Sequence, residues 1–488
     1  MRLTELINGI KAIQVAGNVQ NEDVTGVEYD SRNVKKNSIF VAVQGFTTDG
    51  RKFIPDALSR GAIAVILDKN NIIPEELFKH NNAVKILVNN SRVALAEISN
   101  LFFDQPSRKL NLIGITGTNG KTTTSYLIEN ILEAAGYKTG LMGTISNRIG
   151  DEIIKSKLTT PESRDLNELL AQMVQKKCKY AVMEVSSHSL ALNRVHSLNY
   201  STAVFTNLTN EHLDFHLNFE SYLEAKKILF DNLPGDAFAV FNSDDSSSTK
   251  LLHDCSAHKY SYGTKGSDFL IKDIRYDISG TSFTIDYRNE SYFIHTSLVG
   301  EFNAYNACAA FAVAALNDID EQKIIDGIKN TSQVPGRFEV LVRGNRKVVI
   351  DYSHTPDSLE KTLYAIRGLN KNGDEIVTVF GCGGNRDRTK RPAMGRIAAE
   401  LSDKVIITSD NPRFEDPFEI INSIKTGISK KNYDVIENRE EAIKNAIRDS
   451  KDHSIILIAG KGHEDYQEIK GTRIHFSDRE AANTYLNS

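Results

Sequence analysis

A glycine-rich turn between a buried strand and an amphipathic helix constrains this chain more than any other feature. Residues 110–116 (LNLIGIT) form an almost continuous apolar run, which is typical of a central parallel strand covered on both faces. Leu127, Ile128 and Ile131 then share one face of a helix that Gly136 ends. This order predicts an α/β fold in which backbone NH groups at the helix start face a ligand.

The turn itself is a variant of a phosphate-binding loop. The usual spacing is Gly, four residues, then Gly-Lys-Ser/Thr, and here Ile115 stands at the first glycine position. We still expect a nucleotide site, because Lys121 can neutralise phosphate oxygens and Thr122 can place its hydroxyl on magnesium. The alternative is a structural turn with an exposed lysine. The predicted nucleotide-binding residues of the loop are Gly117, Thr118, Asn119, Gly120, Lys121, Thr122 and Thr123.

The length of 488 residues indicates about three domains, because single cores rarely grow beyond about 300 residues. Apolar runs alternate with helical patterns on both sides of the loop, as in α/β proteins. We predict a small α/β domain over residues 1–108, a central domain with a mainly parallel sheet over 109–335 and a Rossmann-like α/β domain over 336–488. Hinge motion is expected near residues 106 and 335. The strands predicted most clearly are 38–45, 62–68, 83–89, 110–116, 180–185, 202–208, 238–242, 348–351, 377–381, 404–410 and 454–460.

Composition narrows the class of protein. The net charge of −4 gives no sign of a nucleic-acid-binding surface. Four widely spaced cysteines without a CxxC pair are typical of a reducing cytosol. Charged residues interrupt the apolar positions of the amino terminus, and no apolar run reaches the roughly 20 residues of a membrane span. We therefore expect a cytoplasmic monomer that acts on small molecules, away from membranes and nucleic acids.

Further motifs are spread over nearly the whole chain. Together with TGTNGKTT at 116–123 they resemble the Mur ligases and the related folylpolyglutamate synthetases, which are ATP-dependent enzymes that join a carboxylate to an amine. The resemblance to the Mur ligases is carried by DSR at 30–32, TTP at 159–161, EVSSH at 184–188, NEHLDFH at 210–216, EAKK at 224–227, GEFNAYN at 300–306, PGRFE at 335–339, DYSHTPDS at 351–358, GCGGNRDRTKRP at 381–392, DNPR at 410–413 and GKGHEDYQ at 460–467.

The chemistry explains why such a site needs these groups. A carboxylate does not react with an amine in water because its oxide is a poor leaving group, so ATP converts it to an acyl phosphate that the amine then attacks. The site must hold a triphosphate, a divalent metal and cationic groups around the transferred phosphoryl. The resemblance implies an enzyme that uses ATP and Mg²⁺ to add meso-2,6-diaminopimelate to the D-glutamate of UDP-N-acetylmuramoyl-L-alanyl-D-glutamate, in peptidoglycan precursor synthesis.

The resemblance assigns catalytic and metal-binding roles to four side chains. Glu184 and His212 are implied to hold magnesium with Thr122, and Lys226 is implied to be carbamylated, which turns it into a carboxylate-like ligand of a second metal. A lysine cation buried near two metal ions would be unfavourable, so conversion to an anion is physically sensible. Without the resemblance, a Glu or His at a strand end is more often structural, and the adjacent lysines of EAKK usually indicate a solvated helix face.

The nucleotide and the nucleotide sugar involve further residues by the same resemblance. Asn303 and Asn306 are implied near the nucleotide, Arg337 toward its phosphates and Asp351 at its ribose. The asparagines could equally cap a helix start, and Arg337 could form a surface ion pair. The residues implied for the UDP-sugar are Tyr29, Ser31, Thr159, Thr160, Ser186, Leu192 and Arg194. Leu192 stands where some relatives carry Gln, and the guanidinium fork of Arg194 suits a diphosphate or carboxylate.

The motif DNPR predicts which amino acid is added. It follows a predicted strand, at the carboxyl edge where open α/β sheets bind substrates. In the resembling family it marks enzymes that add diaminopimelate, whose distal carboxylate a guanidinium can bind with two charge-assisted bonds, whereas lysine lacks that carboxylate. The alternative is that Arg413 pairs with Glu415 or Asp416 at the surface. The residues implied for diaminopimelate are Arg386, Asp410, Asn411, Pro412, Arg413, Gly460 and Glu464, the last suited to the ammonium.

Two other classes of protein remain to be distinguished. A folylpolyglutamate synthetase would share the loop and the reaction, but it would not be expected to carry a full amino-terminal domain with DSR, nor DNPR. A phosphate-loop switch or motor would couple hydrolysis to a partner and would not require the GNRDR and GKGHED loops. Dependence of ATP turnover on a UDP-sugar peptide and an amino acid would distinguish these classes.

Overall fold

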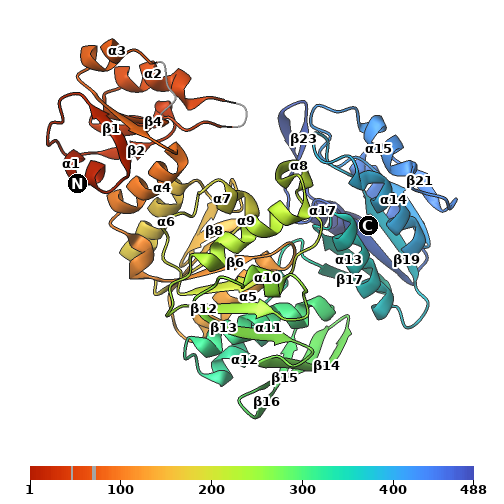
Figure 1. Cartoon of the computed structure of the whole chain (residues 1–488). Coiled ribbons are helices and arrows are strands. Elements are labelled where there is room, and N and C mark those ends of the chain that lie inside the picture. Colours follow the sequence, from red (N-terminus) through yellow and green to blue (C-terminus); the bar gives the residue numbers. More distant parts are fainter. Residues whose placement is uncertain (46–47, 69–72, 488) are drawn as a thin grey trace.

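The computed structural model describes residues 1–45, 48–68 and 73–487. The chain forms three α/β units, with the amino-terminal and carboxy-terminal units on either side of the central one (Figure 1). This confirms the predicted fold class. Each unit buries a sheet between helices, and the strands predicted most clearly from sequence are all present within a few residues.

The first unit is a five-stranded sheet in the order β1-β5-β4-β3-β2, parallel except for β1. Helices α1 and α4 pack on one face and α2 and α3 on the other. Its elements are α1 (Leu3–Asn8), β1 (Ala12–Ala16), β2 (Gly26–Glu28), β3 (Ser38–Val41), α2 (Ile54–Ser59), β4 (Ala62–Asp68), α3 (Glu75–His80), β5 (Val84–Val88) and α4 (Ser91–Phe102).

The central unit is built on an eleven-stranded sheet whose middle strands are parallel. Antiparallel strands extend it at both edges, in the order β16-β15-β14-β13-β12-β11-β6-β10-β7-β8-β9. Its strands are β6 (Asn111–Thr116), β7 (Thr139–Met142), β8 (Ser146–Ile149), β9 (Glu152–Lys155), β10 (Tyr180–Glu184), β11 (Thr202–Phe205), β12 (Phe238–Asn242), β13 (His258–Gly263), β14 (Phe269–Asp277), β15 (Gly280–Tyr287) and β16 (Glu290–Thr296).

Helices cover both faces of this sheet, as the apolar runs predicted. Helices α5, α11 and α12 pack on one face, and α6, α7 and α9 pack on the other. Helix α11 is buried on nearly all sides because its sequence is rich in alanine and other apolar residues. The helices are α5 (Lys121–Ala134), α6 (Ser163–Gln175), α7 (Ser187–Ala191), α8 (Leu213–His216), α9 (Phe219–Asp231), α10 (Ser248–Leu251), α11 (Glu301–Leu316) and α12 (Glu321–Asn330).

The third unit is a six-stranded sheet in the order β17-β18-β22-β19-β20-β21, parallel except for β17. Helices α13, α14 and α15 pack on one face, and α16 and α17 on the other. Its elements are β17 (Glu339–Arg343), β18 (Arg346–Asp351), α13 (Pro356–Leu369), β19 (Glu375–Phe380), α14 (Lys390–Leu401), β20 (Lys404–Ile407), α15 (Pro417–Lys425), β21 (Tyr433–Val435), α16 (Arg439–Asp449), β22 (Ser454–Ala459), β23 (Tyr466–Ile469), β24 (Thr472–His475) and α17 (Asp478–Leu486).

Both junctions between units contain left-handed backbone. Asp104 and Gln105 have φ angles of 61° and 49°, and Gly336 has a φ of 64°. A Cβ on Gly336 would lie 2.1 Å from the backbone nitrogen of His463, so the second junction requires glycine. The domain boundaries at 108/109 and 335/336, and hinge motion near them, stay predictions.

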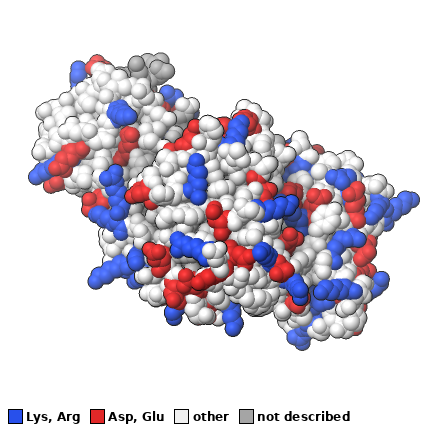
Figure 2. Space-filling model, turned by 60° about the horizontal axis from the view of Figure 1, so that its bottom comes forward, with Lys and Arg blue, Asp and Glu red and all other residues white. Residues whose placement is uncertain are grey.

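The surface carries charges of both signs (Figure 2), and the cysteines lie inside the protein. On the face seen in Figure 2, acidic and basic side chains are interspersed. All four cysteines are buried and free of disulfides. Within the described residues, no helix combines the length and the apolar character that crossing a membrane would require.

A fully buried ion pair supports the third unit beneath its substrate-facing edge. Arg439, at the start of α16, donates to both carboxylate oxygens of Asp478 at 2.7 and 2.8 Å, and both side chains have no exposed surface. The same guanidinium donates to the carbonyl oxygens of Ala459, the last residue of β22, at 3.0 Å and of Ser409, just after β20, at 3.4 Å. The pair therefore joins two helix starts to the ends of two strands that flank β19 in the sheet.

Replacing Asp478 with alanine should lower the free energy of unfolding by about 3–5 kcal/mol, because it leaves the Arg439 cation buried without its partner. Urea unfolding followed by circular dichroism measures the change. Glu400→Ala is the control: its 3.0 Å pair with Arg396 is about half exposed, so its loss should cost less than about 1 kcal/mol. Equal losses in the two variants would contradict this reading.

Candidate functional site

A cavity of about 650 Å³ lies between the central and carboxy-terminal units. Residues that follow three different strands meet in this cavity because the strands are parallel and end together. Glu184 pairs with Ile115 and Phe205 pairs with Thr116, so β10, β6 and β11 end at one edge of the sheet. The lining includes these residues predicted from sequence: Gly117, Thr118, Asn119, Gly120, Lys121, Thr122, Thr123, Thr159, Glu184, Ser186, His212, Lys226, Asn306, Arg337 and Asp351.

The glycines of the loop let it pack closely against its neighbours. Gly117 has a φ of 148°, and a Cβ there would lie 1.9 Å from the Thr206 hydroxyl oxygen. Gly120 has a φ of 88°, and a Cβ there would lie 2.5 Å from the Asn306 amide oxygen. Both positions therefore require glycine despite the unusual spacing.

Lys121 differs from the exposed side chain of the alternative interpretation. It is partly buried, and its ammonium donates to the carbonyl oxygens of Gly117 and Thr118 at 2.8 Å each. Burial lowers the pKa of Lys121, although the carboxylates of Glu211 and Glu184 act in the opposite direction. The lysine thus bonds to its own loop, and phosphate oxygens could replace the two carbonyls as partners of the ammonium.

Glu184 is a buried carboxylate at the centre of a hydroxyl network. It accepts hydrogen bonds from the Thr122 hydroxyl at 3.0 Å and from the Thr144 amide and hydroxyl at 2.8 and 2.9 Å. Arg337 donates to the same Thr122 hydroxyl at 3.1 Å and stacks over the Tyr352 ring. Arg337 is therefore directed at the phosphate-binding loop and is not an ordinary surface ion pair.

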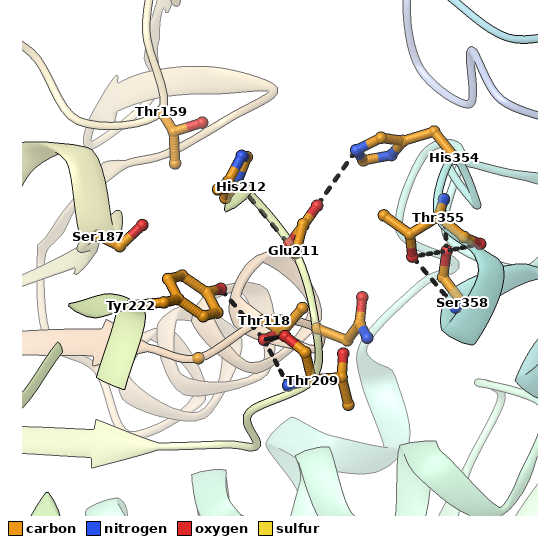
Figure 3. Close-up of polar contacts among 12 residues, drawn as sticks. Thr118, Thr159, Ser187, Thr209, Glu211, His212, Tyr222, His354, Thr355 and Ser358 are labelled. Carbon is orange, nitrogen blue, oxygen red and sulfur yellow. Dashed lines mark hydrogen bonds and ion pairs between the residues drawn. The ribbon is translucent and has the colours of Figure 1, made fainter. Parts of the chain in front are cut away.

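His212 adopts a left-handed backbone conformation with a φ of 57°, which is uncommon for a residue other than glycine and often marks functional sites. Burial lowers its pKa to about 4, so the imidazole is neutral at neutral pH. The adjacent Glu211 lies between His212 Nε2, at 3.7 Å, and His354 Nε2, at 3.3 Å (Figure 3). This group spans the central and carboxy-terminal units.

Lys226 is buried, which contradicts the solvated helix face expected from the adjacent lysines alone. Its side chain is 1% exposed, its ammonium donates to the Gly117 carbonyl at 3.0 Å, and it lies 4.6 Å from the centre of the Tyr222 ring. Burial, reinforced by the charge of Lys121, lowers the pKa of Lys226 well below its usual value. By contrast, Lys227 pairs with Asp231 and Asp254.

The donor set fits a magnesium ion bound together with nucleotide phosphates. Among the described residues there is no group of three or more His, Cys, Asp and Glu side chains that could enclose a metal by itself. Magnesium in nucleotide sites, however, is held by one or two protein oxygens plus phosphates and water. The Glu184 carboxylate and the Thr122 hydroxyl, joined at 3.0 Å, supply such oxygens, and the neutral His212 imidazole lines the same cavity.

Of the asparagines and Asp351 expected near the nucleotide, two line the cavity and Asn303 lies behind one of them. Asn306 lines the cavity and donates to the Asn303 amide oxygen at 3.0 Å, while Asn303 lies behind it and donates to the Val299 carbonyl at 2.9 Å. Neither caps α11, whose N-cap is Gly300. Asp351 lines the cavity and accepts from the Phe338 amide at 2.7 Å, so it also holds the second junction.

The residues expected to bind the UDP-sugar follow the interface between the first two units. Tyr29 donates to Asp165 at 2.7 Å, which joins the first unit to α6, and Ser31 is buried at the start of a short 3₁₀ helix. Thr160 donates to the Glu184 carbonyl at 2.8 Å, and Ser186 caps α7. Tyr29, Ser31, Thr160, Leu192 and Arg194 do not line the cavity.

Arg194 is held at this interface by a shared carboxylate. Its Nε lies 2.8 Å from Glu162, and its Nη1 donates to the Thr160 carbonyl at 3.2 Å. Arg92 of α4, in the first unit, lies 3.6 Å from the same Glu162. One carboxylate therefore links two guanidiniums from different units, a contact that the sequence interpretation missed.

The residues expected to bind the amino acid gather at the carboxyl edge of the third sheet. Arg413, with a φ of 51°, donates to the Gly384 carbonyl at 2.8 Å. It does not pair with Glu415 or Asp416: Glu415 pairs with Arg388 and Arg391, so the surface-pair alternative is wrong. Asp410 is buried, and its carboxylate accepts a hydrogen bond from the backbone NH of Asn411, which Pro412 follows. Arg386 is exposed on the facing loop.

Glu464 approaches this edge from the loop after β22. The side-chain amide of Asn411 donates a hydrogen bond to the Glu464 carboxylate at 2.8 Å. The fully buried Lys461 ammonium donates to the same carboxylate at 3.2 Å and to the Asn411 side-chain oxygen at 3.1 Å. Gly460, with a φ of 117°, passes so close to Asp410 that a Cβ would lie 2.6 Å from its carboxylate. The DNPR and GKGHED segments are thus one structural unit.

Sequence reasoning missed three residues at this site, of which Glu211 and His354 line the cavity. Glu211, His354 and Asp357 occur inside motifs that were recognised, but no role was assigned to them. Asp357, in the first turn of α13, accepts from Asn119 at 3.0 Å and from Thr209 at 3.2 Å, so the phosphate-binding loop contacts the third unit directly. Their acidic and imidazole groups in those motifs were the only available signal.

Three family profiles match consecutive parts of the chain. They are described as "Mur ligase family, catalytic domain" over residues 23–103, "Mur ligase middle domain" over 115–314 and "Mur ligase, glutamate ligase domain" over 336–462.

Named relatives match the chain over nearly its full length. A Clostridium tetani protein named "UDP-N-acetylmuramoyl-L-alanyl-D-glutamate--2,6-diaminopimelate ligase" is 43% identical, over 98% of this chain and 98% of its own length. A Bacillus licheniformis protein of the same name is 41% identical, over 99% of this chain and 98% of its own length. A solved structure with that name has a TM-score of 0.70 and 32% identity, covering 100% of this chain and 99% of its own.

A folylpolyglutamate synthase from Thermotoga maritima shares only the fold. Its structure has a TM-score of 0.58 and 20% identity, and it covers 76% of this chain and 89% of its own. The full-length relatives and the three consecutive profiles account for the whole molecule better than this partial match. The chain belongs to the Mur ligase family.

Proposed function

We propose that this protein is an ATP-dependent ligase that adds meso-2,6-diaminopimelate to the D-glutamate of UDP-N-acetylmuramoyl-L-alanyl-D-glutamate, in peptidoglycan precursor synthesis. The full-length relatives carry the name of this activity. The observation that carries the choice of amino acid is Arg413, whose guanidinium does not pair with Glu415 and donates to the Gly384 carbonyl, at the same edge of the third sheet as Glu464.

In this proposal the carboxylate of D-glutamate attacks the terminal phosphoryl of ATP, and ADP leaves as the bond between the γ-phosphorus and the bridging oxygen breaks. The amine of diaminopimelate then attacks the acyl phosphate, forms the amide and displaces inorganic phosphate. Lys121 moves from the loop carbonyls to the phosphates, and Arg337 adds a second cation from the junction. Both charges stabilise the negative charge that develops on the transferred group. Asp351 and Asn306 line the nucleotide end of the cavity, with Asn303 supporting Asn306.

Thr122, Glu184 and His212 would hold magnesium, which neutralises phosphate charge when bound. A carbamylated Lys226 would add a carboxylate to this set. The buried position of Lys226 supports this proposal, because burial lowers the pKa of the lysine and so favours the neutral amine, which is the form that can react with carbon dioxide.

The remaining assignments concern the other substrate and the state of the protein. Tyr29, Ser31, Thr159, Thr160, Ser186, Leu192 and Arg194 would bind the UDP-sugar, close to the first two units' interface. We propose that the enzyme acts as a monomer, in the cytoplasm where its substrate ATP is available. The proposed domain boundaries, 108/109 and 335/336, lie just before β6 and β17, the first strands of the second and third sheets.

An amino-acid panel tests the function, with phosphate release measured in the presence of ATP and the UDP-sugar dipeptide. meso-Diaminopimelate should support turnover, and L-lysine should be at least about 10²-fold poorer in kcat/KM, because lysine lacks the distal carboxylate that would form charge-assisted hydrogen bonds with the partly buried Arg413. Comparable use of lysine would contradict the role of Arg413, and turnover independent of the UDP-sugar would contradict the ligase assignment.

In the same assay, Arg413→Ala should raise the KM for meso-diaminopimelate by about 10²-fold, because two charge-assisted hydrogen bonds are lost. The KM for ATP should stay within about twofold. Arg396→Ala is the matched control, since Arg396 forms an exposed pair with Glu400 in the same unit. A similar rise in both Michaelis constants would indicate a general structural effect instead.

Lys121→Ala should abolish ligation, lowering kcat by about 10³-fold or more, because the cation that stabilises the transferred phosphoryl is removed. The melting temperature should stay close to that of the wild type, since the side chain contributes only two hydrogen bonds to loop carbonyls. Lys176→Ala, which removes a lysine from an exposed pair with Glu152, is the control. Normal activity of Lys121→Ala would refute the phosphate-loop assignment.

Lys226→Ala should lose activity and partly regain it with added bicarbonate and a short-chain carboxylate, because a small anion can occupy the space of the missing carbamate. Lys227→Ala should keep its activity, since the neighbouring lysine pairs with Asp231 and Asp254 away from the cavity. Steady-state phosphate release measures both. Wild-type behaviour of Lys226→Ala would exclude a catalytic role.

A further inference from the structure

The hairpin formed by β23 and β24 is joined to the DNPR segment by several hydrogen bonds. The Arg413 amide donates to the Glu468 carbonyl at 3.0 Å, and the Lys470 amide donates back to the Arg413 carbonyl at 2.6 Å. The Glu468 amide donates to the Asn411 side chain at 2.9 Å, and Gln467 donates to the Asp410 carbonyl at 2.7 Å. The position of Glu468 relative to Arg413 is therefore defined by backbone contacts.

The Glu468 side chain faces the expected amino-acid site. Its carboxylate lies 3.7 Å from Arg413 Nε, and both side chains are 20% exposed. Tyr466 precedes it by two residues on β23, so both side chains lie on one face of the hairpin. Burial and the charges of Glu464 and Glu468 raise the pKa of the Tyr466 phenol, while the guanidiniums of Arg473, which lies 4.3 Å from the centre of the ring, and Arg413 act in the opposite direction.

The charges at this edge are paired within the protein, but unequally. Lys461 binds Glu464 at 3.2 Å and shares Asn411 with it, so that pair is closely hydrogen-bonded. Arg413 and Glu468 are at 3.7 Å, beyond a hydrogen bond, and Arg413 is held instead by the Gly384 carbonyl at 2.8 Å. The loosely paired Arg413 and Glu468 can therefore separate at little cost to admit a ligand with both signs of charge.

We propose that Glu468 is a specificity-determining residue that makes the site select an amino acid whose distal end is a zwitterion. The inference rests on the proposed function, in which the distal carboxylate of diaminopimelate binds Arg413. That carboxylate comes close to Glu468 and is repelled by it unless the substrate also brings an ammonium, which Glu468 and Glu464 attract. Glu468 thus penalises a diacid that lacks the distal amine, just as Arg413 penalises an amine that lacks the distal carboxylate.

The test compares three amino acids with the wild-type enzyme and Glu468→Gln, which removes the charge but keeps the shape. They are meso-diaminopimelate, 2-aminoheptanedioate, which lacks only the distal amine, and L-lysine, which lacks the distal carboxylate. Relative to diaminopimelate, kcat/KM for 2-aminoheptanedioate should rise about tenfold in Glu468→Gln, whereas that for lysine should not rise. A general loosening of the site would raise both analogues together.

Two further variants make the outcome decisive. Glu468→Asp keeps the charge and should keep most of the wild-type preference, while Glu400→Gln removes an exposed carboxylate of the same unit and should change no ratio. Unchanged ratios in Glu468→Gln, or equal rises for both analogues, would overturn the inference while leaving the proposed function intact. Failure of the wild-type enzyme to use diaminopimelate would overturn the proposed function and this inference with it.

Discussion

The close packing of the glycine loop against its neighbours is the constraint on which the rest of the site depends. Gly117 and Gly120 allow residues 117–120 to lie directly against Thr206 and Asn306, where any side chain would collide. That approach brings the Gly117 carbonyl within reach of both Lys121 and Lys226, and it places Thr122 against Glu184. One backbone contact thus sets the positions of the groups that would receive ATP.

Charged side chains around the two expected substrate regions have partners within the protein. Lys121 closes on loop carbonyls, and Glu464 is held by Lys461 and Asn411. Unpaired charges in such partly buried places would cost free energy of desolvation, so a ligand must replace the existing partners of these charges. The looser contacts, such as that of Arg413 with Glu468, are the ones that a substrate can most readily exchange.

Contacts between units give the cavity its second wall. Asp357 binds Asn119 of the phosphate-binding loop, and His354 faces Glu211. Helix α13 belongs to the third unit and the loop belongs to the central unit. Movement at the junction near Gly336 would therefore change the distance between them and so the width of the cavity beside the loop. Arg337 and Asp351 lie at that junction, so the same residues that would contact nucleotide also connect the units.

The sequence by itself determined the α/β class, the three units, the loop and the motifs at strand ends, because these depend on local apolar patterns and on residue types at short spacing. The residue pattern alone could not separate Lys226 from Lys227, since both lie on one helix, and only the family resemblance singled out Lys226. Packing against Gly117 and Tyr222 buries Lys226, whereas Lys227 pairs with Asp231. Nor could the sequence tell that Glu415 binds Arg391 and leaves Arg413 to Glu468. Such pairings join segments far apart in the chain, and the tertiary structure alone decides which of several nearby opposite charges come within reach.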